Sequence, residues 1–290
     1  MIFRIKKRTK KYIIFLIICI CSISITSYFK NMISRHKINS DFMYVHYINV
    51  DQGDSILIQV NNKNLLIDSG PKTHKKSLLK YLKSLGISNL DYVIATHPHD
   101  DHIGNMNTII NNFDIKYFYA PKVYSSTNSF EKMIECLKNK NLKIIPIKRN
   151  CNTIFLGPKT SINIFSPIND IYDNENNYSP VIKISYGNTS FLFTGDAEKE
   201  IENELLELND DISSDVLKIA HHGSSTSTSD SFLQKVNPKY AVISVGKNNV
   251  YGHPDKNTLS KLDKYNIKTL RTDMDGNITI ISDGHSLRFC

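Results

Sequence analysis

The chain has 290 residues, of which 40% are hydrophobic, and a formal net charge of +8. That size allows one large domain or two small ones, and the hydrophobic content allows a full core. Residues 1–42 hold nine Lys/Arg and one acidic residue, whereas residues 43–290 hold 27 Lys/Arg and 27 Asp/Glu, which excludes the net charge as an argument for a nucleic-acid partner. The five cysteines lack the spacing of a metal site, and a disulfide among Cys136, Cys151 and Cys290 stays open.

The N-terminal segment combines a basic start with an apolar run. Six Lys/Arg precede the run from Tyr12 to about Phe29, which is just long enough to span a bilayer. The positive-inside rule places the basic flank in the cytoplasm and everything after Lys30 outside. We therefore expect residues 1–42 to form a basic tail, one N-terminal transmembrane helix and a stalk, in a single-pass membrane protein with an extracytoplasmic domain. Secretion after signal cleavage is the alternative, although no Ala-x-Ala site follows the run.

Residues 43–290 are expected to form one globular domain in which strands and helices alternate. In its first half, apolar periodicity and turn residues predict strands at 43–50, 55–60 and 64–67, a helix over 78–85, a strand at 90–95, a helix near 107–112, a strand at 117–120, a helix near 130–138 and a strand at 142–147.

The second half repeats this rhythm with a different sequence. The patterns predict strands at 153–156 and 161–166, a polar loop at 169–178, a hairpin of 181–186 and 190–194, a helix after Gly195-Asp196-Ala197, a strand at 216–220, a helix at 232–236, a strand at 241–245, a helix at 259–265 and two or three C-terminal strands.

The stretch from Thr96 to Asn105 contains three histidines and two aspartates within six positions. Burying so many polar groups is costly unless something binds them, and imidazole with carboxylate is the ligand set of zinc-like metals. His97 and His99 project to the same side of an extended strand end and can hold one metal. Asp101 and His102 then serve a second metal, given a tight turn. The alternative, in which Asp101 only caps the next helix, leaves the three histidines unexplained.

Other polar residues follow later predicted strands, where they are able to line a site between two sheets. Asp196 is expected to bridge two metals, with an N-cap role as the alternative. His221 and His222 point in opposite directions if their strand continues, so that one ligates while the other contacts substrate or packs. Asp68 is expected to brace the histidine loop, and His253 to protonate a leaving group.

The strings His-x-His-x-Asp-His, Phe-Thr-Gly-Asp and Leu-Lys-Ile-Ala-His-His-Gly-Ser resemble the metallo-β-lactamase superfamily. Asp51-Gln52-Gly53-Asp54-Ser55 and Tyr251-Gly252-His253-Pro254 resemble the hydrolase domain of ComEC-type competence proteins, over nearly all of 43–290. The resemblance implies an αββα four-layer sandwich with metals at one edge. It also implies metal ligands at His97, His99, Asp101, His102, Asp196 and one of His221/His222. Ser224, Ser225 and Asn249 are expected to contact the substrate.

Two features depart from this family pattern. No histidine occurs between Ile103 and Gly195, where many members supply a third ligand to the first metal, so Asn177 or Ser179 is expected to stand in weakly. The His97/His99 site should therefore bind its metal less tightly. ComEC-type proteins also carry a multi-span channel domain, whereas this chain has one apolar segment and cannot form a conduit by itself.

These observations predict a metal-dependent hydrolase that uses two divalent ions, zinc or manganese. Asp101 and His253 are the residues expected to take part in catalysis. The resemblance favours a DNA phosphodiester as the substrate. The alternatives are a small phosphoester of the phosphocholine type, or a non-catalytic binding component of a DNA-uptake or surface complex.

Overall fold

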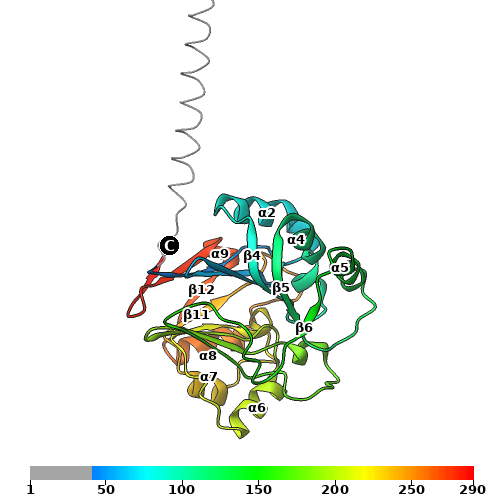
Figure 1. Ribbon diagram of the computed structural model, residues 1–290. Helices are drawn as coiled ribbons and strands as arrows, with labels where there is room; N and C mark the ends of the chain where they lie inside the picture. The colour runs from blue at the N-terminus through cyan, green and yellow to red at the C-terminus, as the bar shows by residue number, and fades with distance from the viewer. Residues whose placement is uncertain (1–40) are drawn as a thin grey trace, which may run out of the picture. The chain divides into compact units, whose positions relative to one another are not determined.

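The computed structural model describes residues 41–290, which form one compact unit built on two β-sheets (Figure 1). The first sheet runs in the order β14 (Leu287–Phe289), β13 (Ile278–Ser282), β1 (Met43–Tyr47), β2 (Ile56–Val60), β3 (Lys63–Ile67), β4 (Asn89–Ile94), β5 (Asp114–Ala120) and β6 (Ile144–Pro146). Neighbours from β14 to β3 pair antiparallel, and neighbours from β3 to β6 pair parallel.

The second sheet has a matching division. It runs in the order β12 (Lys268–Arg271), β11 (Tyr240–Ile243), β10 (Val216–Lys218), β9 (Thr189–Phe193), β8 (Ile182–Tyr186) and β7 (Thr160–Ile164). β7, β8 and β9 pair antiparallel, whereas β9 to β12 pair parallel. Each sheet therefore has parallel strands whose carboxyl ends meet at one edge, where ligand sites form in such folds.

Helices cover the outer face of each sheet, as Figure 1 shows. The first sheet carries α2 (Lys75–Ser84), α3 (Asp100–Ile103), α4 (Met106–Asn112) and α5 (Asn128–Asn139), and the second carries α6 (Lys199–Glu207), α7 (Asp230–Val236) and α8 (Lys256–Lys264). Short helical segments complete the described elements: η1 (Lys72–His74), η2 (Glu175–Tyr178), η3 (Ala220–Gly223) and α9 (Thr272–Asp275). The layer order is helix, sheet, sheet, helix, which confirms the predicted αββα sandwich.

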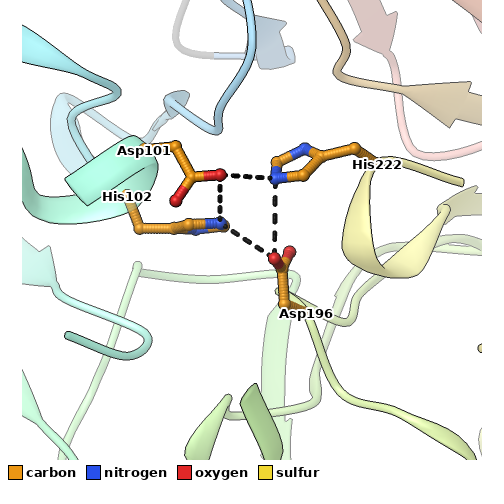
Figure 2. Close-up of side chains that lie close together, drawn as sticks. All are labelled: Asp101, His102, Asp196 and His222. Atoms are coloured by element: carbon orange, nitrogen blue, oxygen red, sulfur yellow. Dashed lines mark ion pairs between the residues drawn. The ribbon is translucent and has the colours of Figure 1, made fainter. Parts of the chain in front are cut away.

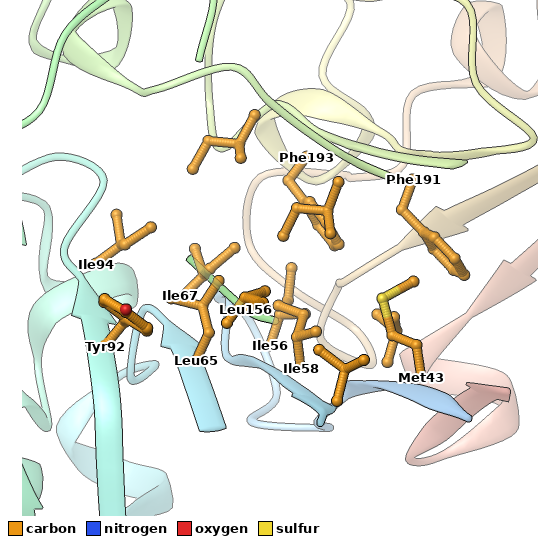
Figure 3. Close-up of a cluster of buried hydrophobic side chains, with 14 of the residues drawn as sticks. Met43, Ile56, Ile58, Leu65, Ile67, Tyr92, Ile94, Leu156, Phe191 and Phe193 are labelled. Carbon is orange, nitrogen blue, oxygen red and sulfur yellow. The ribbon is translucent and has the colours of Figure 1, made fainter. Parts of the chain in front are cut away.

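Side-chain alternation builds the three interfaces between these four layers. Ile56 and Ile58 of β2 face the second sheet, while Leu57 between them packs under the helices of the first sheet. In β9, Phe193 faces the first sheet and Leu192 faces α6. The inter-sheet core is shown in Figure 3. Both faces of these strands are buried, so apolar residues follow one another at Ile56-Leu57-Ile58 and Phe191-Leu192-Phe193.

The strand predicted at 153–156 does not form. Ile154 and Leu156 are buried in the inter-sheet core, as an apolar run requires, but the segment pairs with neither sheet. Side chains satisfy its carbonyls instead, because Asn61 donates to Leu156 O at 2.9 Å and Tyr92 donates to Phe155 O at 3.1 Å. Burial pattern alone therefore could not separate this irregular segment from a strand.

The predicted membrane location is contradicted. No helix within residues 41–290 is long and apolar enough to cross a bilayer. The apolar run at 12–29, on which that prediction depended, lies outside the described residues. The extracytoplasmic placement of the domain followed from the same run and is withdrawn with it.

Candidate metal centre

Three loops that follow parallel strands supply the centre. β4 ends at Ile94 and leads through Thr96–His99 into α3, whose first turn holds Asp101 and His102. β9 is followed by Asp196, and β10 by η3. Helix α3 starts after His99 and α6 starts after Glu198, with no side-chain cap on either, so neither aspartate has the capping role considered from the sequence.

The loops bring Asp101, His102, Asp196 and His222 together, and one ligand atom from each lies within 4.8 Å of all the others (Figure 2). His102 Nε2 lies 3.2 Å from Asp196 Oδ2, and His222 Nε2 lies 3.2 Å from Asp101 Oδ2. His222 Nε2 also lies 3.5 Å from Asp196 Oδ2. Two imidazole nitrogens and two carboxylates from three separate loops therefore converge on one point.

The donor atoms of this cluster lack other partners. His102 Nε2, His222 Nε2 and Asp196 Oδ1 are buried and make no hydrogen bond within the described chain. Leaving such atoms unpaired is costly, and a cation between the two Nε2 atoms and the Asp196 carboxylate would satisfy both nitrogens. Burial would raise the pKa of Asp196, but His102 and His222 hold it well below its usual range. The residues present thus fit a divalent ion with nitrogen and oxygen ligands.

Beside this cluster lies the pair predicted to hold a first metal. His97 Nε2 lies 3.0 Å from His99 Nδ1 and 3.9 Å from Asp196 Oδ2, the oxygen that also faces His102. The His97 side chain is fully buried, and burial is the main cause that lowers its pKa well below the usual value. The His99 side chain is 40% exposed. Asp196 therefore lies between two histidine sets, in the place expected for a bridging carboxylate.

The two stand-ins suggested for a missing third histidine are occupied elsewhere. Asn177 Oδ1 accepts a hydrogen bond from the Glu198 amide at 3.0 Å, and Asn177 Nδ2 donates to helix α6. Ser179 Oγ accepts from the Asp196 amide at 3.1 Å and lies 3.3 Å from His97 Nδ1, the ring nitrogen turned away from His99. Ser179 thus braces His97 from outside, and Asn177 ties the loop to α6.

Outer hydrogen bonds orient the buried histidines. Asp68 Oδ2 lies 2.8 Å from His102 Nδ1, and the same carboxylate accepts from the amide and hydroxyl of Thr96 at 2.9 and 2.7 Å. His222 Nδ1 donates to Ser244 O at 2.9 Å. Each contact leaves the Nε2 atom of the histidine directed at the centre, which is how outer partners set the tautomer of a ligand.

The structure separates His221 from His222. β10 ends at Lys218, and both histidines adopt a left-handed backbone in η3, with φ of 50° and 53°, so they do not alternate across a strand as expected. His222 belongs to the four-residue cluster. His221 Nδ1 lies 3.1 Å from Glu198 Oε1, and its Nε2 lies 3.9 Å from Asp196 Oδ2. Sequence reasoning missed Glu198, whose only signal was its position two residues after Asp196.

A buried ion pair supports the centre from behind. Lys218 Nζ lies 2.8 Å from Asp54 Oδ2, and both side chains are inaccessible. The Asp54 amide donates to Asp101 O at 3.1 Å, and a Cβ at Gly53 would collide with that same carbonyl oxygen, so the loop packs directly on α3. A lysine within the apolar strand 216–220 was the available signal, because a buried ammonium needs a carboxylate partner.

The centre opens into a cavity of about 580 Å³. Its lining includes His99, Asp101 and His253, together with Tyr251, which is 66% exposed and stacks on the His253 ring. Burial, and after it the neighbouring His221, lowers the pKa of His253.

The three predicted substrate contacts do not line this cavity. Ser224 is buried with its hydroxyl on Thr226, and Ser225 is exposed outside the cavity. Asn249 organises the 246–253 loop, where its Oδ1 accepts from the amides of Tyr251 and His253.

Two curated proteins are similar in sequence to most of this chain. ComE operon protein 3 of Bacillus subtilis (strain 168) is 34% identical over 252 residues, which cover 81% of this chain and 32% of that protein. Competence protein ComA of Neisseria gonorrhoeae is 30% identical over 229 residues, covering 78% of this chain and 30% of that protein. The chain therefore spans about a third of the length of these curated relatives.

Solved structures share the fold at low sequence identity. The metallo-beta-lactamase fold protein YhfI from Bacillus subtilis superposes with a TM-score of 0.53 at 14% identity, covering 80% of this chain and 96% of that chain. Igni18, a metallo hydrolase from Ignicoccus hospitalis, gives 0.53 at 16% identity, covering 82% and 98%. The family model described as the metallo-beta-lactamase superfamily matches residues 48–247, which include the four-residue cluster. The chain belongs to the metallo-beta-lactamase superfamily and is a metal-dependent hydrolase of that fold.

Proposed function

We propose that this chain is a metal-dependent phosphodiesterase that acts on DNA. The observation that carries the proposal is the pairing of two adjacent donor sets, His97/His99 and Asp101/His102/His222, around the single carboxylate of Asp196. Two-metal centres of this kind hold both the attacking and the leaving oxygen of a phosphoryl group. The choice of DNA is supported by the resemblance to ComEC-type competence proteins and by the relative named Competence protein ComA, and by nothing in the charge of residues 43–290.

Bound zinc or manganese would supply Lewis acidity and a water that ionises near neutral pH. The protein's part is to hold the ligands and shape the cavity. Asp68 and Ser244 fix the ring orientation of His102 and His222, so these ligands need no reorganisation when substrate arrives. His253 lies at the cavity wall, and its lowered pKa keeps it neutral near pH 7. A neutral imidazole still donates one N–H, so His253 suits a hydrogen bond to a phosphate oxygen better than delivery of a proton.

A direct test uses the full chain, stripped with chelator and reloaded with Mn²⁺ or Zn²⁺. The substrates are single-stranded DNA, double-stranded DNA, bis-p-nitrophenyl phosphate and p-nitrophenylphosphocholine. We expect metal-dependent cleavage of DNA that Asp101→Ala removes. Turnover of the phosphocholine ester without cleavage of DNA would point to the small-phosphoester alternative. DNA binding in a gel-shift assay, with no turnover of any substrate, would replace the enzyme with a binding component.

A further inference from the structure

Glu175 lies at the start of η2, beside the exposed edge of the His97/His99 pair. Its Oε2 lies 3.2 Å from His99 Nε2, and both side chains are 40% exposed. The other ring nitrogen of His99, Nδ1, lies 3.0 Å from His97 Nε2. The two nitrogens of His99 therefore have separate partners, a carboxylate on one side and the neighbouring ligand on the other.

This arrangement sets the tautomer of His99. A neutral imidazole carries one N–H and one lone pair, and a carboxylate only accepts, so the proton belongs on Nε2 and the lone pair on Nδ1. The lone pair on His99 Nδ1 then lies on the side of the ring that faces His97 Nε2. Two nitrogens 3.0 Å apart match the spacing that metal–nitrogen bonds of about 2.1 Å produce at an angle of about 90°.

The Glu175 carboxylate contributes more to the ring orientation of His99 than it would if that histidine were buried. Within residues 41–290, the side chains that contact His97 Nδ1 are two neutral hydroxyls, those of Thr96 at 3.1 Å and Ser179 at 3.3 Å. His99 is half in solvent, where its ring would otherwise rotate freely and exchange its proton with water. Among the histidines predicted from the sequence as ligands for this first metal, His99 alone has a charged partner on its outer nitrogen.

We propose that Glu175 is a positioning residue that selects the Nδ1-ligating tautomer of His99 and thereby strengthens a first metal site that lacks a third histidine. The inference rests on the metal-dependent function proposed above. It places Glu175 behind the ligand and not in contact with the ion, in the way that Asp68 stands behind His102. Removing such an outer partner typically weakens metal binding about 10-fold to 100-fold.

The experiment titrates chelator-stripped full chain with Mn²⁺ and counts free Mn²⁺ from its electron paramagnetic resonance signal. We expect two dissociation constants for the wild type. Glu175→Ala should raise the larger dissociation constant about 10-fold to 100-fold and leave the smaller one unchanged. Glu175→Gln keeps an acceptor for the Nε2–H but loses the charge, so its loss should be smaller. This isosteric variant also decides the question if the alanine variant does not fold.

The matched control is Asp173→Ala, which removes the same charge from the same loop. Asp173 is exposed and makes no hydrogen bond or ion pair within the part of the chain that the structure describes. Asp173→Ala should bind Mn²⁺ like the wild type, which separates the contact to His99 from the general loss of a negative charge. A Glu175→Ala variant that binds both ions as well as Asp173→Ala does would overturn the proposal.

A double-mutant cycle with His99→Ala distinguishes positioning from direct ligation. If Glu175 acts through His99, then Glu175→Ala should weaken Mn²⁺ binding no further in the His99→Ala background. Additive losses would show that Glu175 contacts the ion itself and would refute the positioning role. None of these measurements needs a substrate. A wild type that binds two ions but cleaves no phosphodiester therefore ends the proposed function alone, whereas normal binding by Glu175→Ala ends this inference alone.

Discussion

The two donor sets beside Asp196 differ in how much protein surrounds them. Asp101, His102 and His222 form the second set, in which both histidines are inaccessible and held by Asp68 and Ser244. His97 and His99 form the first set, in which one histidine is 40% exposed and no third histidine follows. The second set has three buried or partly buried donors of its own. The first set has two histidines, and its geometry depends more on the residues that contact their outer nitrogens.

In a set with fewer histidines, the hydrogen bonds and ion pairs that hold each ring in place become more important. A buried ligand cannot rotate, so its geometry is held by packing as well as by hydrogen bonds. His99 is partly exposed, so directed contacts must hold its geometry, and Glu175 supplies one of them.

The largest effect should come from Asp101→Ala. Asp101 faces His222 at 3.2 Å, and its side chain is 29% exposed, so its loss removes a donor from the second set without opening the apolar core. Activity should fall roughly 10³-fold or more, because metal-bound water ionises near neutral pH whereas bulk water is far less acidic. Steady-state turnover of bis-p-nitrophenyl phosphate measures this, with Asp114→Ala as the control for an exposed aspartate at the far end of a strand in the same sheet. Equal loss in both variants would mean that the second set is not the catalytic one.

His253→Ala should have a smaller effect. His253 lies at the cavity wall, 5.7 Å from His221 between ring centroids, and belongs to neither donor set. Losing one hydrogen bond to the developing charge costs about 10²-fold to 10³-fold in kcat. Metal content should stay at the wild-type value, as it should for the exposed control His285→Ala. Loss of bound metal in His253→Ala would make this residue a third ligand of the first set.

Asp68→Asn should weaken metal binding in the second set about 10-fold to 100-fold. Asparagine keeps the shape and accepts from Thr96, but it does not provide the charge that faces His102 Nδ1. Asp91→Asn is the matched control, since Asp91 is also buried in the first sheet and pairs instead with Lys63 at 3.0 Å. Mn²⁺ titration should shift the tighter dissociation constant in Asp68→Asn only. A shift of the weaker constant would show that Asp68 supports the other set.

The smallest effect on function should come from His46→Gln, which tests a buried histidine outside both sets. Burial lowers the pKa of His46 to about 4, from about 6.5 in an unfolded chain. The unfolded state therefore gains this proton first, and stability is lost as the pH falls from about 6.5 towards 4, by roughly 3 kcal/mol. Urea unfolding between pH 7 and 4 in chelator should show a shallower decline for His46→Gln. Identical slopes would assign the acid sensitivity to other groups, such as the metal-binding carboxylates.

Local sequence was sufficient wherever a short stretch carries both the chemistry and the strand before it. The buried strand at 90–95 and the histidine motif after it are contiguous, so the donors from His97 to His102 follow from side-chain geometry along one segment. The periodicity of the elements predicted alternating strands and helices, and the family resemblance added the αββα class. Asp196 was identifiable for the same reason, because it directly follows the apolar strand β9.

Three features followed from the tertiary structure alone: the choice between His221 and His222, the irregular 153–156 segment, and the contact of Glu175 with His99. The choice of His222 over His221 depends on where β10 ends and on two left-handed residues, and the loss of the 153–156 strand depends on side chains from Asn61 and Tyr92. Glu175 reaches His99 across a separation of 76 positions in the sequence. Sequence periodicity reports burial and direction within one element, whereas these contacts depend on how separate loops meet at the edge of two packed sheets. The sequence motifs therefore located the candidate ligands, except for the choice between His221 and His222, and only the fold showed which partners orient them.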